Sequence, residues 1–150
     1  MRTVRIPVVT LCMVRESVSN YRGERVLTPG DAARLWHEFQ KRRGEPDREQ
    51  FWVLCLDSRK QPTTLHMVSQ GTLNNALVHP REAFKVAILA NADSVVFFHN
   101  HPSGNAEASD DDKKITTQLV AAGKILGIEV SDHIISGQDR WASMRVLGML

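Results

Sequence analysis

The sequence has little of what marks several large classes of protein. Its 150 residues include two cysteines and one tyrosine, and aromatic residues make up 6%. No apolar run approaches the ~20 residues that a membrane span needs. The formal net charge is only +2, which is too small to indicate nucleic-acid binding by itself. We therefore expect a cytoplasmic protein with no membrane partner.

The two cysteines and the N-terminus exclude further classes. Cys12 and Cys55 each lie in an apolar run, which favours buried, reduced thiols over a disulfide or a metal ligand. The run Ile6–Val14 is only partly similar to a signal peptide, because Pro7 interrupts it and no small-residue cleavage site follows. We expect an edge strand over Val8–Val14 instead.

What remains is the composition of an ordinary globular domain. Apolar residues make up 42% and charged residues 24%, and no repeat, linker or low-complexity tract interrupts the chain. A chain of this length can bury about 70% of its unfolded surface, so we expect one domain over residues 1–150. The basic groups Arg22–Arg25 and Lys41–Arg43 are more typical of a solvated loop or helix end than of a DNA-binding surface.

Hydrophobic periodicity predicts a mixed β-sheet flanked by helices, an α/β or α+β fold. Helices are expected from the start signal Thr28–Asp31 to Gly44, over 81–90, and over 110–126 with Gly127 as the cap. Strands are expected over 8–14, 51–56, 65–68, 94–98, 128–135 and 141–146. The continuous apolar run Phe51–Leu56 predicts a central strand that is covered on both faces.

The most informative stretch is His99–Gly104, with the sequence His-Asn-His-Pro-Ser-Gly. Residues i and i+2 of an extended chain point the same way, so His99 and His101 can face one ion. The turn after them allows a later segment to bring back Asp112. Hydrolytic zinc sites commonly use three such ligands and keep a fourth position for water. The pattern therefore predicts a zinc site.

Ser109 and Asp112 also have a simpler interpretation. A serine followed three residues later by an acidic residue is a helix N-terminal signature, because the hydroxyl accepts an early backbone N–H and the acid favours the positive helix end. The two interpretations are compatible, since a residue on the first turn of a helix is held rigidly enough to be a ligand.

The spacing His-x-His-Pro-x(6)-Ser-x-x-Asp resembles the JAMM metal motif of the JAB/MPN-domain metalloproteases, and more narrowly the bacterial RadC family. The matching stretches are Asp47–Phe51, Leu54–Asp57, Gly71–Leu73, Val78–Glu82, His99–Gly104 and Asp132–Ile135. The resemblance runs from about Val8 to the C-terminus, without the extra N-terminal helical region of full-length RadC proteins. It implies a JAB/MPN fold of cytidine deaminase-like architecture with His99, His101 and Asp112 as zinc ligands.

The resemblance also implies a chemistry. Glu49 would be the general base, and Ser109 would hydrogen-bond the tetrahedral intermediate; the residues alone leave Glu45, Glu82 and Glu107 open as bases. The expected function is a zinc-dependent hydrolase that cleaves peptide or isopeptide amides of a protein or peptide substrate. The alternative is a DNA repair-associated accessory protein that binds metal or DNA without peptidase activity.

Other residues of interest have mainly structural interpretations. His133 is expected to form a structural hydrogen bond near the metal, with direct ligation as the alternative. Arg81 is expected at the surface, and His37 and His66 at surface or satisfied core positions. The tryptophans are expected in or at the edge of the core rather than as stacking platforms for single-stranded nucleic acid: Trp36, Trp52 and Trp141.

Overall fold

The computed structural model describes residues 3–22, 25–44, 46–71 and 78–150. In chain order its elements are α1 (Pro29–Arg43), β1 (Gln50–Leu56), β2 (Pro62–Gln70), α2 (Pro80–Leu89), β3 (Ser94–Asn100), α3 (Asp110–Leu126), β4 (Glu129–Ser136) and β5 (Trp141–Ser143). Three groups singled out in the sequence lie wholly or partly outside the described residues: Glu45, Gly23 and Glu24 of the first basic group, and Thr72 and Leu73 of the stretch Gly71–Leu73.

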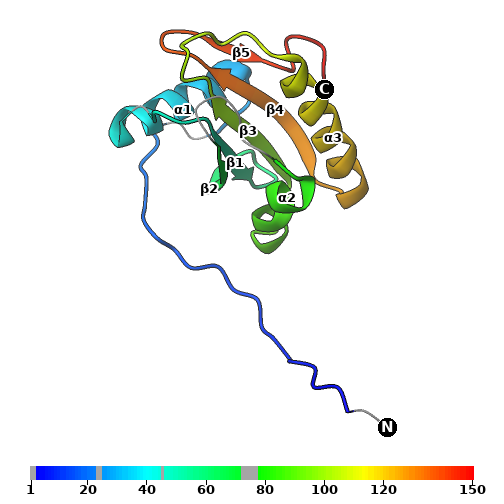
Figure 1. The fold of residues 1–150 in the computed structure, drawn as a ribbon. Coiled ribbons are helices and arrows are strands. Elements are labelled where there is room, and N and C mark those ends of the chain that lie inside the picture. Colours follow the sequence, from blue (N-terminus) through cyan, green and yellow to red (C-terminus); the bar gives the residue numbers. More distant parts are fainter. Residues whose placement is uncertain (1–2, 23–24, 45, 72–77) are drawn as a thin grey trace.

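The strands of the described chain form one mixed sheet in the order β2-β1-β3-β4-β5 (Figure 1). β1 pairs antiparallel with both β2 and β3, and β5 pairs antiparallel with β4. β3 and β4 run parallel, and α3 makes the crossover connection that a parallel pair requires. The mixed sheet with flanking helices is as the sequence predicts.

Helices cover both faces of this sheet. Val53 and Phe97 on the central strands pack with Phe84 of α2 in one core cluster, which α3 also joins. Trp52, on the opposite side of β1, packs with Trp36 of α1 in a second cluster. Fully burying a large apolar side chain contributes ~1.5–3 kcal/mol, so both layers stabilise the sheet. The core positions expected for these two tryptophans are confirmed.

The helix boundaries follow their capping residues. Thr28 begins α1 with a capping box, in which its Oγ1 accepts the Asp31 N–H at 3.1 Å and an Asp31 oxygen accepts the Thr28 N–H at 3.0 Å. Gly127 ends α3 in the left-handed conformation with φ of 70°. Within the described ranges, none of the helices has the length and apolar character that crossing a bilayer requires.

The expected edge strand over Val8–Val14 is wrong. Residues 3–20 belong to no helix or strand and extend away from the sheet (Figure 1). Val8 is 100% exposed. Cys12 is exposed as well, so the buried thiol is confirmed for Cys55 alone, where burial raises the pKa to about 12. β-branched residues favour a strand only where a neighbouring strand accepts their hydrogen bonds, and no described strand pairs with this run.

The last expected strand is shorter than predicted, because polar side chains turn the chain after Ser143. The Ser143 hydroxyl donates to Asp132 Oδ2 at 2.6 Å, and its oxygen accepts the Val146 N–H at 3.1 Å. The Arg145 N–H donates to the other Asp132 oxygen at 3.1 Å. Trp141, at the start of this strand, is 48% exposed and lies only at the edge of the core.

Candidate metal centre

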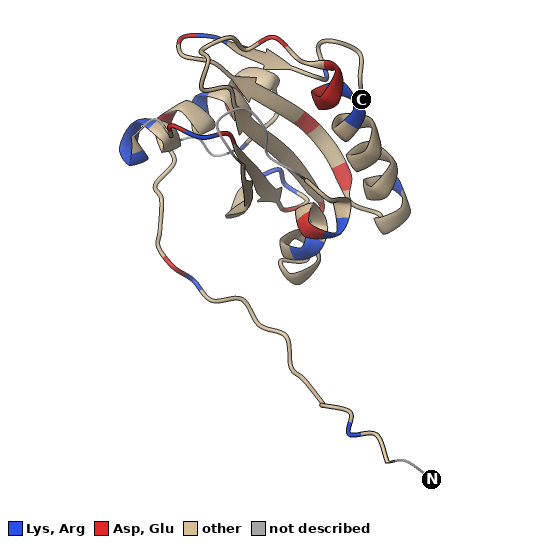
Figure 2. Ribbon diagram, viewed as in Figure 1, with Lys and Arg blue, Asp and Glu red and all other residues tan. Residues whose placement is uncertain are grey.

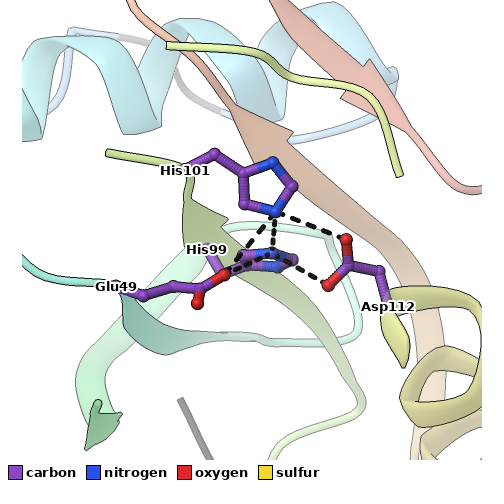
Figure 3. A group of neighbouring side chains, drawn as sticks. All are labelled: Glu49, His99, His101 and Asp112. Atoms are coloured by element: carbon purple, nitrogen blue, oxygen red, sulfur yellow. Dashed lines mark hydrogen bonds and ion pairs between the residues drawn. The ribbon is translucent and has the colours of Figure 1, made fainter. Parts of the chain in front are cut away.

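The strand register brings an acidic residue beside the two histidines. Phe51 of β1 lies opposite His99 of β3 in an antiparallel pair, and continuing this register places Glu49 opposite His101. Asp112 reaches the same point from the first turn of α3. Figure 3 shows the four side chains of Glu49, His99, His101 and Asp112 converging from these three segments.

The four side chains present their ligand atoms at short range. The Nε2 atoms of His99 and His101 are 2.8 Å apart. Asp112 offers one oxygen to each ring, with Oδ1 at 3.1 Å from His99 Nε2 and Oδ2 at 3.3 Å from His101 Nε2. Glu49 Oε1 lies 3.4 Å and 3.6 Å from the same two nitrogens. All four ligand atoms lie within 4.8 Å of one another.

This donor set fits a divalent metal ion. Ligand bonds of about 2.0–2.1 Å in tetrahedral geometry put neighbouring donor atoms roughly 3.3 Å apart, and the measured separations scatter around that value. Imidazole nitrogens with carboxylate oxygens are a usual ligand set for first-row metals. Glu49, His99 and Asp112 are buried and His101 half-buried, so the ion would sit mostly out of bulk water.

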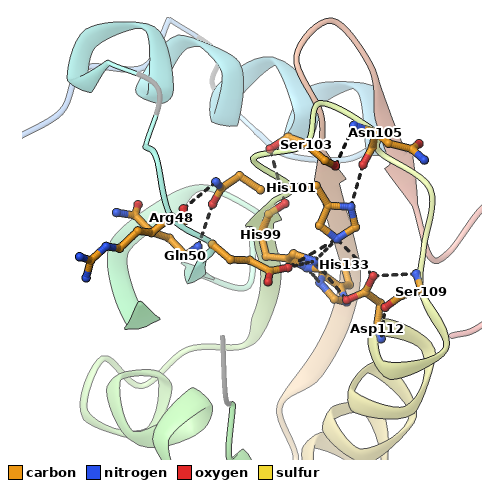
Figure 4. Close-up of polar contacts among 12 residues, drawn as sticks. Arg48, Gln50, His99, His101, Ser103, Asn105, Ser109, Asp112 and His133 are labelled. Atoms are coloured by element: carbon orange, nitrogen blue, oxygen red, sulfur yellow. Dashed lines mark hydrogen bonds and ion pairs between the residues drawn. The ribbon is translucent and has the colours of Figure 1, made fainter. Parts of the chain in front are cut away.

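Each histidine is held by its other ring nitrogen. His101 Nδ1 is 2.7 Å from the backbone oxygen of Asn105, and His99 Nδ1 is 2.8 Å from Nε2 of His133. Both rings therefore turn Nε2 toward the centre (Figure 4). His133 contacts a candidate ligand and is not among the four clustered residues, which confirms the expected structural hydrogen bond.

Ser109 and Asp112 form a capping box at the start of α3. Ser109 Oγ accepts the Asp112 N–H at 3.1 Å, and the Ser109 N–H donates to Asp112 Oδ2 at 2.7 Å. The capping interpretation is therefore confirmed, and the same bonds aim the carboxylate at the histidines. The exposed Ser109 hydroxyl uses an acceptor position in the cap, and its own proton has no acceptor among the described residues.

Hydrogen bonds and burial shift the pKa values of several side chains in and beside the cluster. Burial raises the pKa of the Asp112 carboxyl, but hydrogen bonds from the imidazoles of His101 and His99 in their charged form, which carries a proton on both ring nitrogens, outweigh it and hold that pKa well below its usual range. The hydrogen bond to Asp112 in turn raises the pKa of His101. Complete burial holds the pKa of His133 well below its usual range. A metal ion needs unprotonated imidazoles, so metal and protons compete for His101.

Asn100, between the two histidines, is a site residue that sequence reasoning missed. It is buried; its Oδ1 accepts the Gln50 N–H at 2.9 Å, and its Nδ2 donates to the Arg48 carbonyl at 2.9 Å. These two bonds bracket Glu49 and fix the segment that carries it. The only signal in the sequence is a polar residue at the end of a strand that contains an apolar run.

The structure brings together His99, His101, Asp112 and Glu49, with Ser109 beside them. It does not bring in the other described alternatives for the base. Glu82 pairs with Lys85 at 2.7 Å on α2, and Glu107 is exposed in the loop before α3. As expected, three further residues are exposed: His37, His66 and Arg81.

A mixed sheet that carries an acidic and histidine cluster between β1, β3 and α3 defines a JAB-type domain with a candidate metal centre. The family described as the RadC-like JAB domain matches residues 27–149, and the chain belongs to this family. JAB domains include some metallohydrolases.

Relatives share much of the sequence. A UPF0758 protein of Symbiobacterium thermophilum is 48% identical over 102 residues, which cover 68% of this chain and 44% of the relative. That of Methanosarcina barkeri is 42% identical over 126 residues, 84% of this chain and 54% of the relative. The UPF0758 protein of Syntrophomonas wolfei is 39% identical over 140 residues, which cover 92% of this chain and 60% of the relative. The chain spans about half the length of these curated relatives, whose names state no activity.

Proposed function

We propose that this domain is a zinc-dependent hydrolase of the JAMM type, which cleaves amide bonds in peptide or isopeptide substrates. The observation that carries the proposal is the convergence of two imidazole nitrogens and two carboxylates on one point, with all ligand atoms within 4.8 Å. Three of these residues are enough to hold the metal, so one carboxylate remains for proton transfer.

The geometry favours Asp112 as the third ligand and Glu49 as the base. Asp112 offers one oxygen to each imidazole and is fixed by the cap of α3. Glu49 offers a single oxygen to both imidazoles at longer range, so its second oxygen is free for a proton. A base in this position can take a proton from the attacking water and pass it to the leaving amine.

A bound zinc would supply a water that ionises near pH ~7 and would polarise the amide carbonyl. The protein supplies the remaining parts. His99, His101 and Asp112 would hold the ion, and Glu49 would carry the proton. The Ser109 hydroxyl can donate a hydrogen bond to the substrate oxygen on which negative charge develops.

The test separates metal binding from catalysis. Glu49→Gln keeps the shape of the side chain and removes the base, so we expect zinc content to stay unchanged while turnover of peptide and isopeptide substrates falls about 10²–10⁴-fold. Glu82→Gln, on an exposed carboxylate that pairs with Lys85, is the matched control and should behave as wild type. Wild-type turnover in Glu49→Gln would remove Glu49 from the mechanism.

A DNA-associated accessory role is the competing hypothesis. Charges of both signs are spread over the molecule (Figure 2). In the basic group at the end of α1, the Arg43 guanidinium stacks over Phe39 at 5.5 Å and over Trp52 at 5.1 Å, which gives it a structural role. The DNA hypothesis predicts an affinity that falls steeply with salt, because phosphate contacts release counterions. A salt-independent binding curve would argue against it.

A further inference from the structure

We propose that Thr116 and His133 are positioning residues that keep Nε2 of His99 unprotonated and directed at the metal. The inference rests on the metal-binding role proposed above and adds two residues to it. Three buried side chains are joined by hydrogen bonds, and the donor in each bond decides which nitrogen of His99 carries the proton.

The chain begins on α3. Thr116 Oγ1 donates its only proton to the backbone oxygen of Asp112 at 2.7 Å. It can therefore only accept from His133 Nδ1, which lies 2.7 Å away. A neutral imidazole with its proton on Nδ1 has a lone pair on Nε2, and this atom is 2.8 Å from His99 Nδ1. His99 must then carry its proton on Nδ1, which leaves Nε2 free to bind a metal.

The two candidate histidine ligands differ in the hydrogen-bond partner that fixes the position of their proton. His101 faces the carbonyl oxygen of Asn105, which can only accept, so its proton is fixed on Nδ1 by that bond alone. His99 faces another imidazole, which can donate or accept. If His133 donated, the proton of His99 would lie on Nε2 and block the metal. The hydroxyl of Thr116 removes this ambiguity.

Burial makes the arrangement rigid. His133 is 0%, Thr116 1% and His99 3% exposed, so bulk water cannot easily replace a missing partner. The Phe51 ring packs against both imidazoles, with centroids 5.9 Å from His99 and 5.3 Å from His133. Thr116 lies one turn after Asp112 on α3, so the helix that carries one ligand also orients another.

The first experiment compares two substitutions of Thr116 in the full chain. Thr116→Val keeps the shape and loses the hydroxyl, whereas Thr116→Ser keeps the hydroxyl and loses a methyl group. We expect the zinc dissociation constant, measured by competition with a chromophoric chelator, to rise about 10–100-fold in the valine variant. The serine variant should stay close to wild type. Equal affinities in the two folded variants would overturn the proposal.

If the valine variant does not fold, two substitutions of His133 compare the same presence and absence of a hydrogen-bond partner for His99. The amide of His133→Gln can still accept from His99 Nδ1, and His133→Leu cannot. We expect zinc to bind more tightly to the glutamine variant, again by about tenfold or more. A leucine variant that binds zinc as well as the glutamine variant would contradict the positioning role.

A second readout needs neither zinc nor activity. Long-range ¹H–¹⁵N NMR of the metal-free protein at alkaline pH reports which nitrogen of His99 carries the proton. We expect Nδ1–H in wild type and Thr116→Ser, and a shift toward Nε2–H in Thr116→Val. Nε2–H in the wild type would overturn the proposal. Failure of zinc to bind, with Nδ1–H observed, would instead count against the proposed hydrolase alone.

Discussion

At the scale of single residues, Ser109 combines a structural and a chemical task. Its oxygen caps α3, and its proton is available to a substrate oxygen. Ser109→Ala should lower the free energy of unfolding of the metal-free protein by about 0.5–2 kcal/mol, because the Asp112 N–H loses its acceptor. Urea unfolding measures this loss.

The control for Ser109 is Ser109→Asn, since asparagine is an equally good cap. We expect it to restore most of the lost stability. A stability in Ser109→Ala equal to that of wild type would show that the cap does not stabilise the helix.

The residues of the site differ in how far the sequence reveals them. His99, His101 and Asp112 lie within one short segment, so their spacing alone predicts that they meet. The role of Glu49 is predicted only by the family resemblance. Local spacing cannot predict it, because the pairing of β1 with β3 is what brings Glu49 to the two histidines. Asn100 could not be found this way, since its partners Arg48 and Gln50 lie about fifty positions away.

At the scale of elements, the site depends on how the start of β1 is attached to β3. Asn100→Ala removes both bonds that bracket Glu49 and leaves the candidate ligands unchanged. We expect zinc content to be retained and turnover to fall by up to about 10²-fold, the effect of a catalytic group misplaced by about 1 Å. Metal analysis and steady-state kinetics measure the two quantities.

A double-mutant cycle tests that Asn100 acts through Glu49. In the Glu49→Gln background, Asn100→Ala should cause no further loss of turnover. A full additional loss would mean that Asn100 affects the site by another route.

The elements also show where sequence patterns end. Apolar runs predict the central strands β1 and β3 correctly. Both strands are buried on both faces, so most of their positions must be apolar. The same kind of run failed over Val8–Val14, since a strand also needs a pairing partner, which no local pattern encodes. The last strand was overextended because Asp132, distant in sequence, bonds the turn after Ser143.

At the scale of the whole molecule, the N-terminal segment should contribute little to the stability of the domain. Exposed large apolar residues are frequent from Val4 to Val18. Deleting residues 1–18 should change the free energy of unfolding by less than about 0.5 kcal/mol, the range of ordinary surface changes. Denaturant titration of both chains measures it.

The matched control is a deletion that extends through Val26. This residue is buried, and its N–H donates to the Lys60 carbonyl at 2.8 Å, so the longer deletion should destabilise the domain clearly. Strong destabilisation by the short deletion would mean that residues 1–18 pack against the domain.

Whether the cluster at β1, β3 and α3 binds zinc can be read from the metal content of the purified protein. The measurement is elemental mass spectrometry on wild type and His101→Ala, both purified without chelators. We expect about one zinc per wild-type chain, as in a mononuclear site, and none in the variant. Zinc retained in His101→Ala, or absent from a wild type supplied with zinc, would contradict this expectation.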